Sequence, residues 1–143
     1  MGTEIFLPVF YMVCLTVVVL LLSTTLRLKE IYLNGTVAGE EHRHPPFNEG
    51  STLLKNVQRN LSNLLEFPVL FYIVCISIYV AGKVDENFIT LAYWFFYLRV
   101  IHSLYHIFLN QLVFKGGFPL RSLMWIPATA IMLWMWLRFV SLI

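Results

Sequence analysis

The sequence predicts an all-α integral membrane protein, a four-helix bundle with antiparallel up-down topology. Two observations lead to this fold class. Of the 143 residues, 59% are hydrophobic and only 13% are charged, about half of the roughly 25% charged residues that soluble domains carry. Four long apolar runs also follow one another, each close to the about 20 residues that cross a bilayer. The composition excludes a disordered chain, a nucleic-acid-binding protein with a basic face and an ordinary cytosolic enzyme.

The first span is expected over about residues 5–26. Glu4 precedes it, whereas Arg27 and Lys29 follow it without a small-residue cleavage site. Because a signal peptide would show the opposite arrangement of charge, we interpret this segment as a retained helix. The other three spans are expected over about residues 60–81, 88–113 and 120–142. A chain this short leaves little room for a second domain, so residues 1–143 are expected to form one membrane domain.

The connections between the spans predict the orientation. Residues 28–58 form one long loop, whereas 82–87 and 114–119 are short turns that make consecutive helices antiparallel neighbours. Basic residues concentrate on the first and third connections and their edges: Arg27, Lys29, Arg43, Lys55, Arg59, Lys115 and Arg121. By the positive-inside rule, the long loop is cytosolic and both termini lie outside.

Polar residues recur inside the second and third spans, where each ionisable group costs about 2.5–3.5 kcal/mol on insertion scales. Arg59, Asn63 and Glu66 share one face of the second span because their spacing matches the helical repeat. The third span carries a second stripe, made of Arg99, His102, His106 and Asn110. Antiparallel spans would bring Glu66 level with the two histidines. The sequence therefore predicts a polar pocket on the cytosolic side of the membrane.

Simpler interpretations stay open for these residues. Glu66 could pair with Arg99 or a histidine as a structural clamp between helices. His102 and His106 could hold a metal ion, but no third ligand is evident in the spans, so no metal site is expected. Lys115 could serve only as a cytosolic anchor of the bundle.

The residues of both stripes carry a resemblance to a known family. The pattern Arg59-x-x-x-Asn63-x-x-Glu66, closely followed by Pro68, is similar to the signature of the MAPEG superfamily, the membrane-associated proteins in eicosanoid and glutathione metabolism. The run from Arg99 to His106, with Asn110 after it, resembles a bacterial branch of that superfamily. The resemblance implies a homotrimer of four-helix subunits, placed in a bacterial inner membrane, with glutathione as co-substrate on the cytosolic side.

The resemblance also implies roles for single residues. Glutathione would be bound by residues of the first three spans: Arg27, Arg59, Asn63, Glu66, His102, His106 and Asn110. Arginine suits the two carboxylates of glutathione because its guanidinium binds them bidentately. Arg99 and Lys115 are the catalytic candidates. Lys115 would stabilise the thiolate where known members carry an arginine, and Arg99 would polarise the pocket.

The function expected from this resemblance is glutathione-dependent transfer to a lipophilic electrophile, or reduction of a hydroperoxide, by a membrane enzyme. His102 and His106 stand roughly where eicosanoid-making members carry tyrosines, which argues against leukotriene or prostaglandin synthesis. Two other functions stay open. One is a non-catalytic membrane module of the same type, and the other is a binder of another small anionic ligand or lipid head group at the same pocket.

Overall fold

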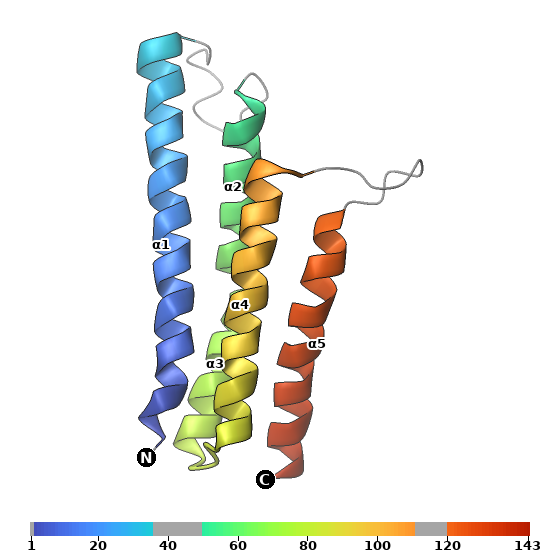
Figure 1. Ribbon diagram of the computed structural model, residues 1–143. Coiled ribbons are helices and arrows are strands. Elements are labelled where there is room, and N and C mark those ends of the chain that lie inside the picture. The colour runs from blue at the N-terminus through green and yellow to red at the C-terminus, as the bar shows by residue number, and fades with distance from the viewer. Residues whose placement is uncertain (1, 36–49, 111–119) are drawn as a thin grey trace.

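The computed structural model describes residues 2–35, 50–110 and 120–143, and all regular structure in these ranges is helical. Helix α1 spans Phe6–Leu28, between the 3-10 turn η1 (Thr3–Ile5) and the π-helical turn η2 (Lys29–Asn34). The later helices are α2 (Thr52–Glu66), α3 (Pro68–Val80), α4 (Glu86–Phe108) and α5 (Leu120–Ser141). Since α2 and α3 form one bent segment, the described residues make four helical segments (Figure 1).

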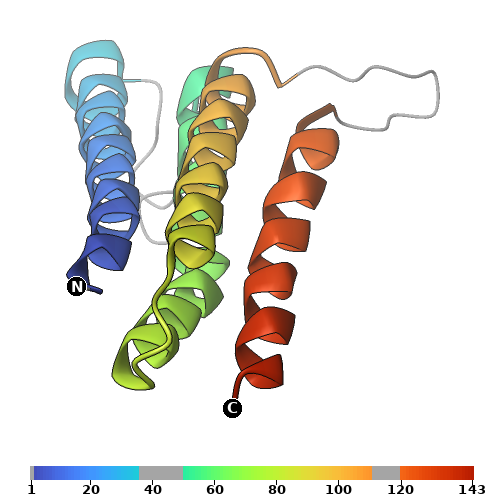
Figure 2. The same ribbon diagram turned by 60° about the horizontal axis from the view of Figure 1, so that its bottom comes forward.

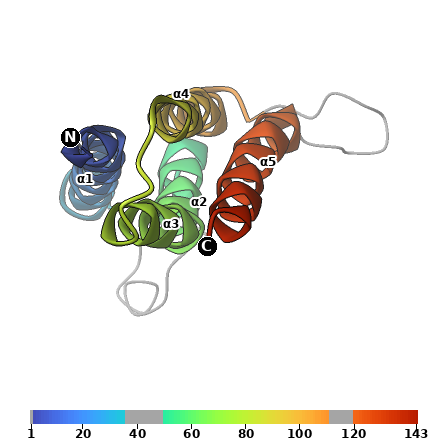
Figure 3. The ribbon, with the colours of Figure 1, turned by 90° about the horizontal axis from the view of Figure 1, so that it is seen from below.

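The four segments run up and down, as the sequence predicts. Both chain ends and the turn from α3 to α4 lie at one end of the bundle, here named the Asp85 end (Figure 1). At the opposite end, here named the groove end, η2 finishes, α2 begins and α4 finishes. Figure 3 shows α1 and α5 on opposite sides of the pair formed by α2–α3 and α4. Helix α4 accordingly packs against α1, α2 and α5.

The bundle has a tightly packed aromatic core and an apolar exterior. The rings of Phe71 and Phe95, both fully buried, stack with their centroids 4.2 Å apart. Large apolar side chains also cover the outer surface, for example Val18, Leu21 and Leu137. Lipid is the solvent in which such a surface is stable.

Three helical segments are long and apolar enough to cross a membrane, namely Thr3–Asn34, Thr52–Val80 and Leu123–Ser141. The chain is therefore a multi-pass integral membrane protein. Helix α4 has 23 residues and a length of about 35 Å at 1.5 Å per residue. It is not among the three apolar segments, since it carries the polar stripe from Arg99 to His106.

The helix that carries the second expected span begins at Thr52, before the apolar run expected from about residue 60. Ser51 starts this helix, because its side-chain oxygen accepts a hydrogen bond from the backbone N–H of Leu54. Glu30, buried in η2, in turn accepts hydrogen bonds from the backbone N–H and the hydroxyl of Ser51. These contacts join the end of α1 to the start of α2.

Candidate functional site

A groove of about 300 Å³ lies between α1 and α2 near the groove end. It is lined from α1 by Leu20, Ser23, Thr24 and Arg27, and from α2 by Gln58, Arg59, Leu61 and Ser62. On each helix the lining residues form pairs three or four positions apart, such as Leu20 with Thr24 and Gln58 with Ser62, so they share one face. The structure thus brings Arg27 and Arg59 together, although 32 positions separate them in the sequence. The volume is at the lower end of the range of about 300–1,000 Å³ for small-molecule sites.

The chemistry of the groove favours anionic groups. Two guanidinium groups, three hydroxyls and one amide line it, and none of its described lining residues is acidic. Arginine forms bidentate, charge-assisted hydrogen bonds with carboxylates and phosphates. Four polar lining residues were not predicted from the sequence, namely Ser23, Thr24, Gln58 and Ser62. Ser23 could have been found, since it lies four positions before Arg27 on the same helical face.

Asn63 and Glu66 do not line the groove. Asn63 is half-buried and its side-chain amide donates to the carbonyl oxygen of Arg59, 3.3 Å away. Glu66 is exposed on the surface of the subunit. The expected placement of Glu66 opposite His102 and His106 is therefore wrong within one subunit.

The reason lies in which face of α2 turns inward. Its buried residues are Leu54, Asn56, Val57, Asn60 and Leu64. The predicted stripe of Arg59, Asn63 and Glu66 lies on a neighbouring face that turns away from α4. A polar residue does face α4, but it is Asn60 and not Asn63, because Asn60 occurs at the four-residue repeat of the buried positions.

A buried polar cluster lies behind the groove, between α2 and α4. It consists of Asn60 on α2 and Arg99, His102, Ser103 and His106 on α4, each at most 2% exposed. The two imidazole rings lie 5.7 Å apart between centroids. The third-span stripe is thus on the inner face of its helix, as the sequence predicted.

Two contacts set the register of these helices and show which members of the cluster face one another. The amide of Asn56 donates to the carbonyl oxygen of Ile107 (3.3 Å), and Arg99 Nη2 donates to that of Asn63 (3.3 Å). Antiparallel helices advance at the same rate in opposite directions. Asn60, midway between these contacts, is therefore level with Ser103.

Several buried polar atoms of the cluster have no hydrogen-bond partner among the described residues. They are Oδ1 and Nδ2 of Asn60, Nε and Nη1 of Arg99, and Oγ of Ser103. Native proteins rarely leave such atoms unsatisfied, since each costs about 1–3 kcal/mol. The cluster is therefore the part of the described interior with the most unused hydrogen-bonding capacity, which is a feature typical of functional sites.

The two remaining candidates are Asn110 and Lys115. The side-chain amide of Asn110 donates to Oδ1 of Asn56 (2.8 Å), so Asn110 joins the end of α4 to α2. This contact lies outside the groove. Lys115 lies outside the described residues.

Comparison with known proteins decides the family. The MAPEG family profile matches residues 5–141, which include the groove, the cluster and all four helical segments. The chain belongs to the MAPEG family. This family commonly uses glutathione. Comparisons with curated proteins and with solved structures gave no match.

Proposed function

We propose that this MAPEG protein is a glutathione-dependent membrane transferase or peroxidase and that glutathione binds in the groove between α1 and α2. The observation that supports the proposal is the meeting of Arg27 and Arg59 in one groove. Glutathione carries two carboxylates, which two arginines can bind bidentately. The hydroxyls of Ser23, Thr24 and Ser62 offer neutral partners for its amide groups.

The proposed chemistry begins at the glutathione thiol. A nearby cation lowers the thiol pKa from about 8.5 by stabilising the thiolate. The thiolate sulfur attacks the electrophilic carbon, and the C–S bond forms as the leaving group departs with its electron pair. With a hydroperoxide, the sulfur attacks the peroxide oxygen and releases the alcohol. A second glutathione then forms the disulfide and releases water. We propose Lys115 as the cation for the thiolate.

The second substrate is lipophilic in this proposal. The groove opens on a surface of α1 that carries large exposed apolar residues, including Leu20 and Leu21. A hydrophobic substrate dissolved in the bilayer could reach the groove along this surface without entering water. The two substrates would then meet at the boundary between water and lipid.

The exposed polar face of α2 supports an oligomer. Arg59, Ser62 and Glu66 are exposed on a segment that is apolar enough to span the membrane. Charged groups facing lipid are costly, so a neighbouring subunit is expected to cover this face. We propose a homotrimer in which Asn63 and Glu66 complete the glutathione site at the subunit boundary. His102, His106 and Asn110 would support that site from behind.

The proposal also includes the orientation of the bundle and the membrane in which the protein lies. Helix α4 would be the fourth membrane pass, since it runs beside the other segments over its full length (Figure 1). The groove end, where Arg27, Lys55 and Arg59 lie, would face the cytosol by the positive-inside rule. Both termini would face outside, and the membrane would be a bacterial inner membrane.

Calorimetry of glutathione binding to the detergent-purified protein tests the proposal. Arg59→Ala should weaken binding at least tenfold, because hydrogen bonds to charged groups contribute about 1.5–3 kcal/mol each. Lys83→Ala is the matched control, since it removes an exposed cation at the Asp85 end and should leave binding unchanged. No heat of binding at millimolar glutathione, from an intact oligomer, would overturn the proposal.

One observation favours a second candidate function. The groove holds cations but no acidic residue among its described lining residues, so none of these residues matches the ammonium group of glutathione. A simple anion such as a lipid phosphate needs no such partner. Inorganic phosphate should then compete for the groove, and a glutathione analogue should fail to displace it. Displacement by the analogue would favour the glutathione site instead.

A further inference from the structure

The bend between α2 and α3 contains a backbone defect inside a membrane-spanning segment. Phe67 keeps helical angles (φ −70°, ψ −42°), so the chain passes from α2 into α3 without an intervening loop. Pro68 follows, and it has no backbone N–H to donate to the carbonyl of Leu64, four positions earlier. A backbone carbonyl without a donor is costly within a bilayer. Figure 2 shows the α3 ribbon leaving the direction of α2 at this bend.

Arg99 from α4 meets this bend. Its Nη2 donates to the carbonyl oxygen of Asn63, 3.3 Å away, which already accepts the N–H of Phe67 at the same distance. Its guanidinium carbon lies 5.6 Å from the centroid of the Phe67 ring. Arg99 is fully buried and forms no ion pair within the described ranges. The hydrogen bond and the ring contact of Arg99 therefore both lie at the end of α2.

We propose that Arg99 is the C-terminal cap of α2 and a positioning residue for the groove, rather than a group that contacts substrate. The last carbonyls of a helix carry partial negative charge, and a cation placed there is stabilising. The ring of Phe67 adds a cation–π contact on the same guanidinium. The cap contacts the carbonyl of Asn63, one residue before the Leu64 carbonyl that Pro68 leaves without a donor, so it stabilises the turn that this proline weakens.

The position of the bend explains why the cap affects the groove. Gln58 and Ser62, which line the groove, lie within the three helical turns before Pro68. Phe67 also contacts the rings of Phe95 (6.2 Å) and Trp125 (5.1 Å), so the bend is packed against α4 and α5. Losing the cap would let the end of α2 turn relative to these helices and move one wall of the groove. The cap would hold this wall in place whichever ligand the groove binds.

A double-mutant cycle tests the cap. The variants Arg99→Gln, Pro68→Ala and their combination would be compared by thermal unfolding of the full-length protein in detergent. Pro68→Ala supplies an N–H that can donate to the Leu64 carbonyl and strengthens the same turn of α2, so Arg99→Gln should lower Tm by less than half as much in that background as in the native one. Ser103→Ala, another buried polar truncation on α4, is the matched control and should cause the same loss in both backgrounds.

Each outcome of the cycle supports or overturns the cap. If Arg99→Gln folds only in the Pro68→Ala background, the cap is supported. If the Tm losses of Arg99→Gln and Pro68→Ala are simply additive, as those of Ser103→Ala and Pro68→Ala should be, the cap is overturned. The cap is also overturned if Arg99→Gln fails to fold in both backgrounds. Arg99→Lys keeps the charge and one donor, and it should recover part of the lost Tm.

The shape of the bend gives a second measurement that a general loss of stability would not change. Spin labels at the exposed positions Leu53 and Tyr79, in a chain with Cys14 and Cys75 replaced, report the distance across the α2–α3 segment. Arg99→Gln should broaden this distance distribution, and Ser103→Ala should leave it narrow. An unchanged distribution in folded Arg99→Gln would overturn the positioning role.

Discussion

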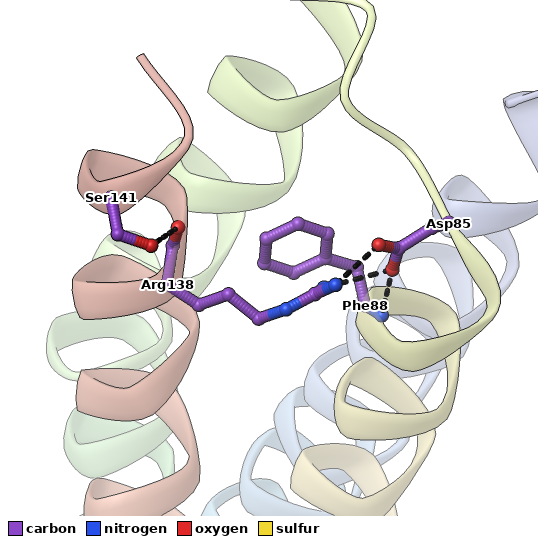
Figure 4. A network of polar contacts seen from close by, with 4 residues as sticks. All are labelled: Asp85, Phe88, Arg138 and Ser141. Carbon is purple, nitrogen blue, oxygen red and sulfur yellow. Dashed lines mark hydrogen bonds and ion pairs between the residues drawn. The ribbon is translucent and has the colours of Figure 1, made fainter.

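The start and the middle of helix α4 differ in how charged residues are satisfied. At the Asp85 end, Arg138 of α5 donates to Oδ1 of Asp85 (2.8 Å) and lies 4.2 Å from the centroid of the Phe88 ring (Figure 4). Asp85 also caps α4 by accepting the backbone N–H of Phe88. In the middle of α4, Arg99 is buried with two nitrogens that have no partner among the described residues.

This difference distinguishes polar contacts that join helices from polar groups that are available to a candidate site. The polar groups of the Asp85 end satisfy one another, so they can join α4 to α5 without any ligand. The cluster of Asn60, Arg99 and Ser103 retains unused hydrogen-bonding capacity, and the arginine groove lies beside it. We therefore expect changes at the Asp85 end to alter stability alone, and changes at the groove end to alter binding.

The largest expected effect comes from Arg27 in the groove. Arg27→Ala should weaken glutathione binding at least tenfold, since it removes one of the two guanidinium groups that line the groove. Arg27→Lys should recover only part of this loss, because lysine keeps the charge but not the bidentate geometry. Calorimetry on both variants measures the effect. Full affinity in Arg27→Lys would show that charge alone is recognised.

Asn60→Leu should separate stability from binding. Both polar atoms of the Asn60 side chain are buried without a partner among the described residues. Replacing them with an apolar side chain of similar size should raise the free energy of unfolding by about 1–3 kcal/mol. If the cluster supports the site, ligand affinity should fall in the same variant. Denaturant titration and calorimetry measure the two quantities, and a destabilised Asn60→Leu variant would show that the amide is satisfied in the membrane.

At the Asp85 end, Asp85→Ala should lower the free energy of unfolding by about 1 kcal/mol, because it removes both the cap of α4 and the partner of Arg138. Glutathione affinity should stay unchanged, since the groove lies at the opposite end of the bundle. Arg138→Gln should cost less, because it keeps the cap. A loss of binding in Asp85→Ala would show that the two ends are coupled.

Sequence periodicity predicted the helical bundle well, because bilayer thickness fixes the length of each apolar segment. It also predicted the inner stripe of α4, whereas Arg27, which lines the groove with Arg59, was named as a site residue only through the family resemblance. It failed for Glu66, since the spacing of polar residues shows that they share a face but not where that face points. The inward face of α2 is set by contacts with α4, such as Asn56 with the carbonyl of Ile107. That contact joins residues 51 positions apart, which no local pattern reports.

The smallest expected effect is a pH dependence from Asp85. The hydrogen bonds from Arg138 hold the pKa of the Asp85 carboxyl below its ordinary value of about 3.9. The carboxyl therefore adds stability that is fully present above pH 4 and is lost as the pH falls through the lowered pKa of the folded state. Because the Asp85 side chain is 40% exposed, solvent screens the pair and the change is small. Thermal unfolding of the native protein and Asp85→Asn should differ more at pH 6 than at pH 2.5, and a constant difference would show that the ion pair contributes nothing beyond the cap.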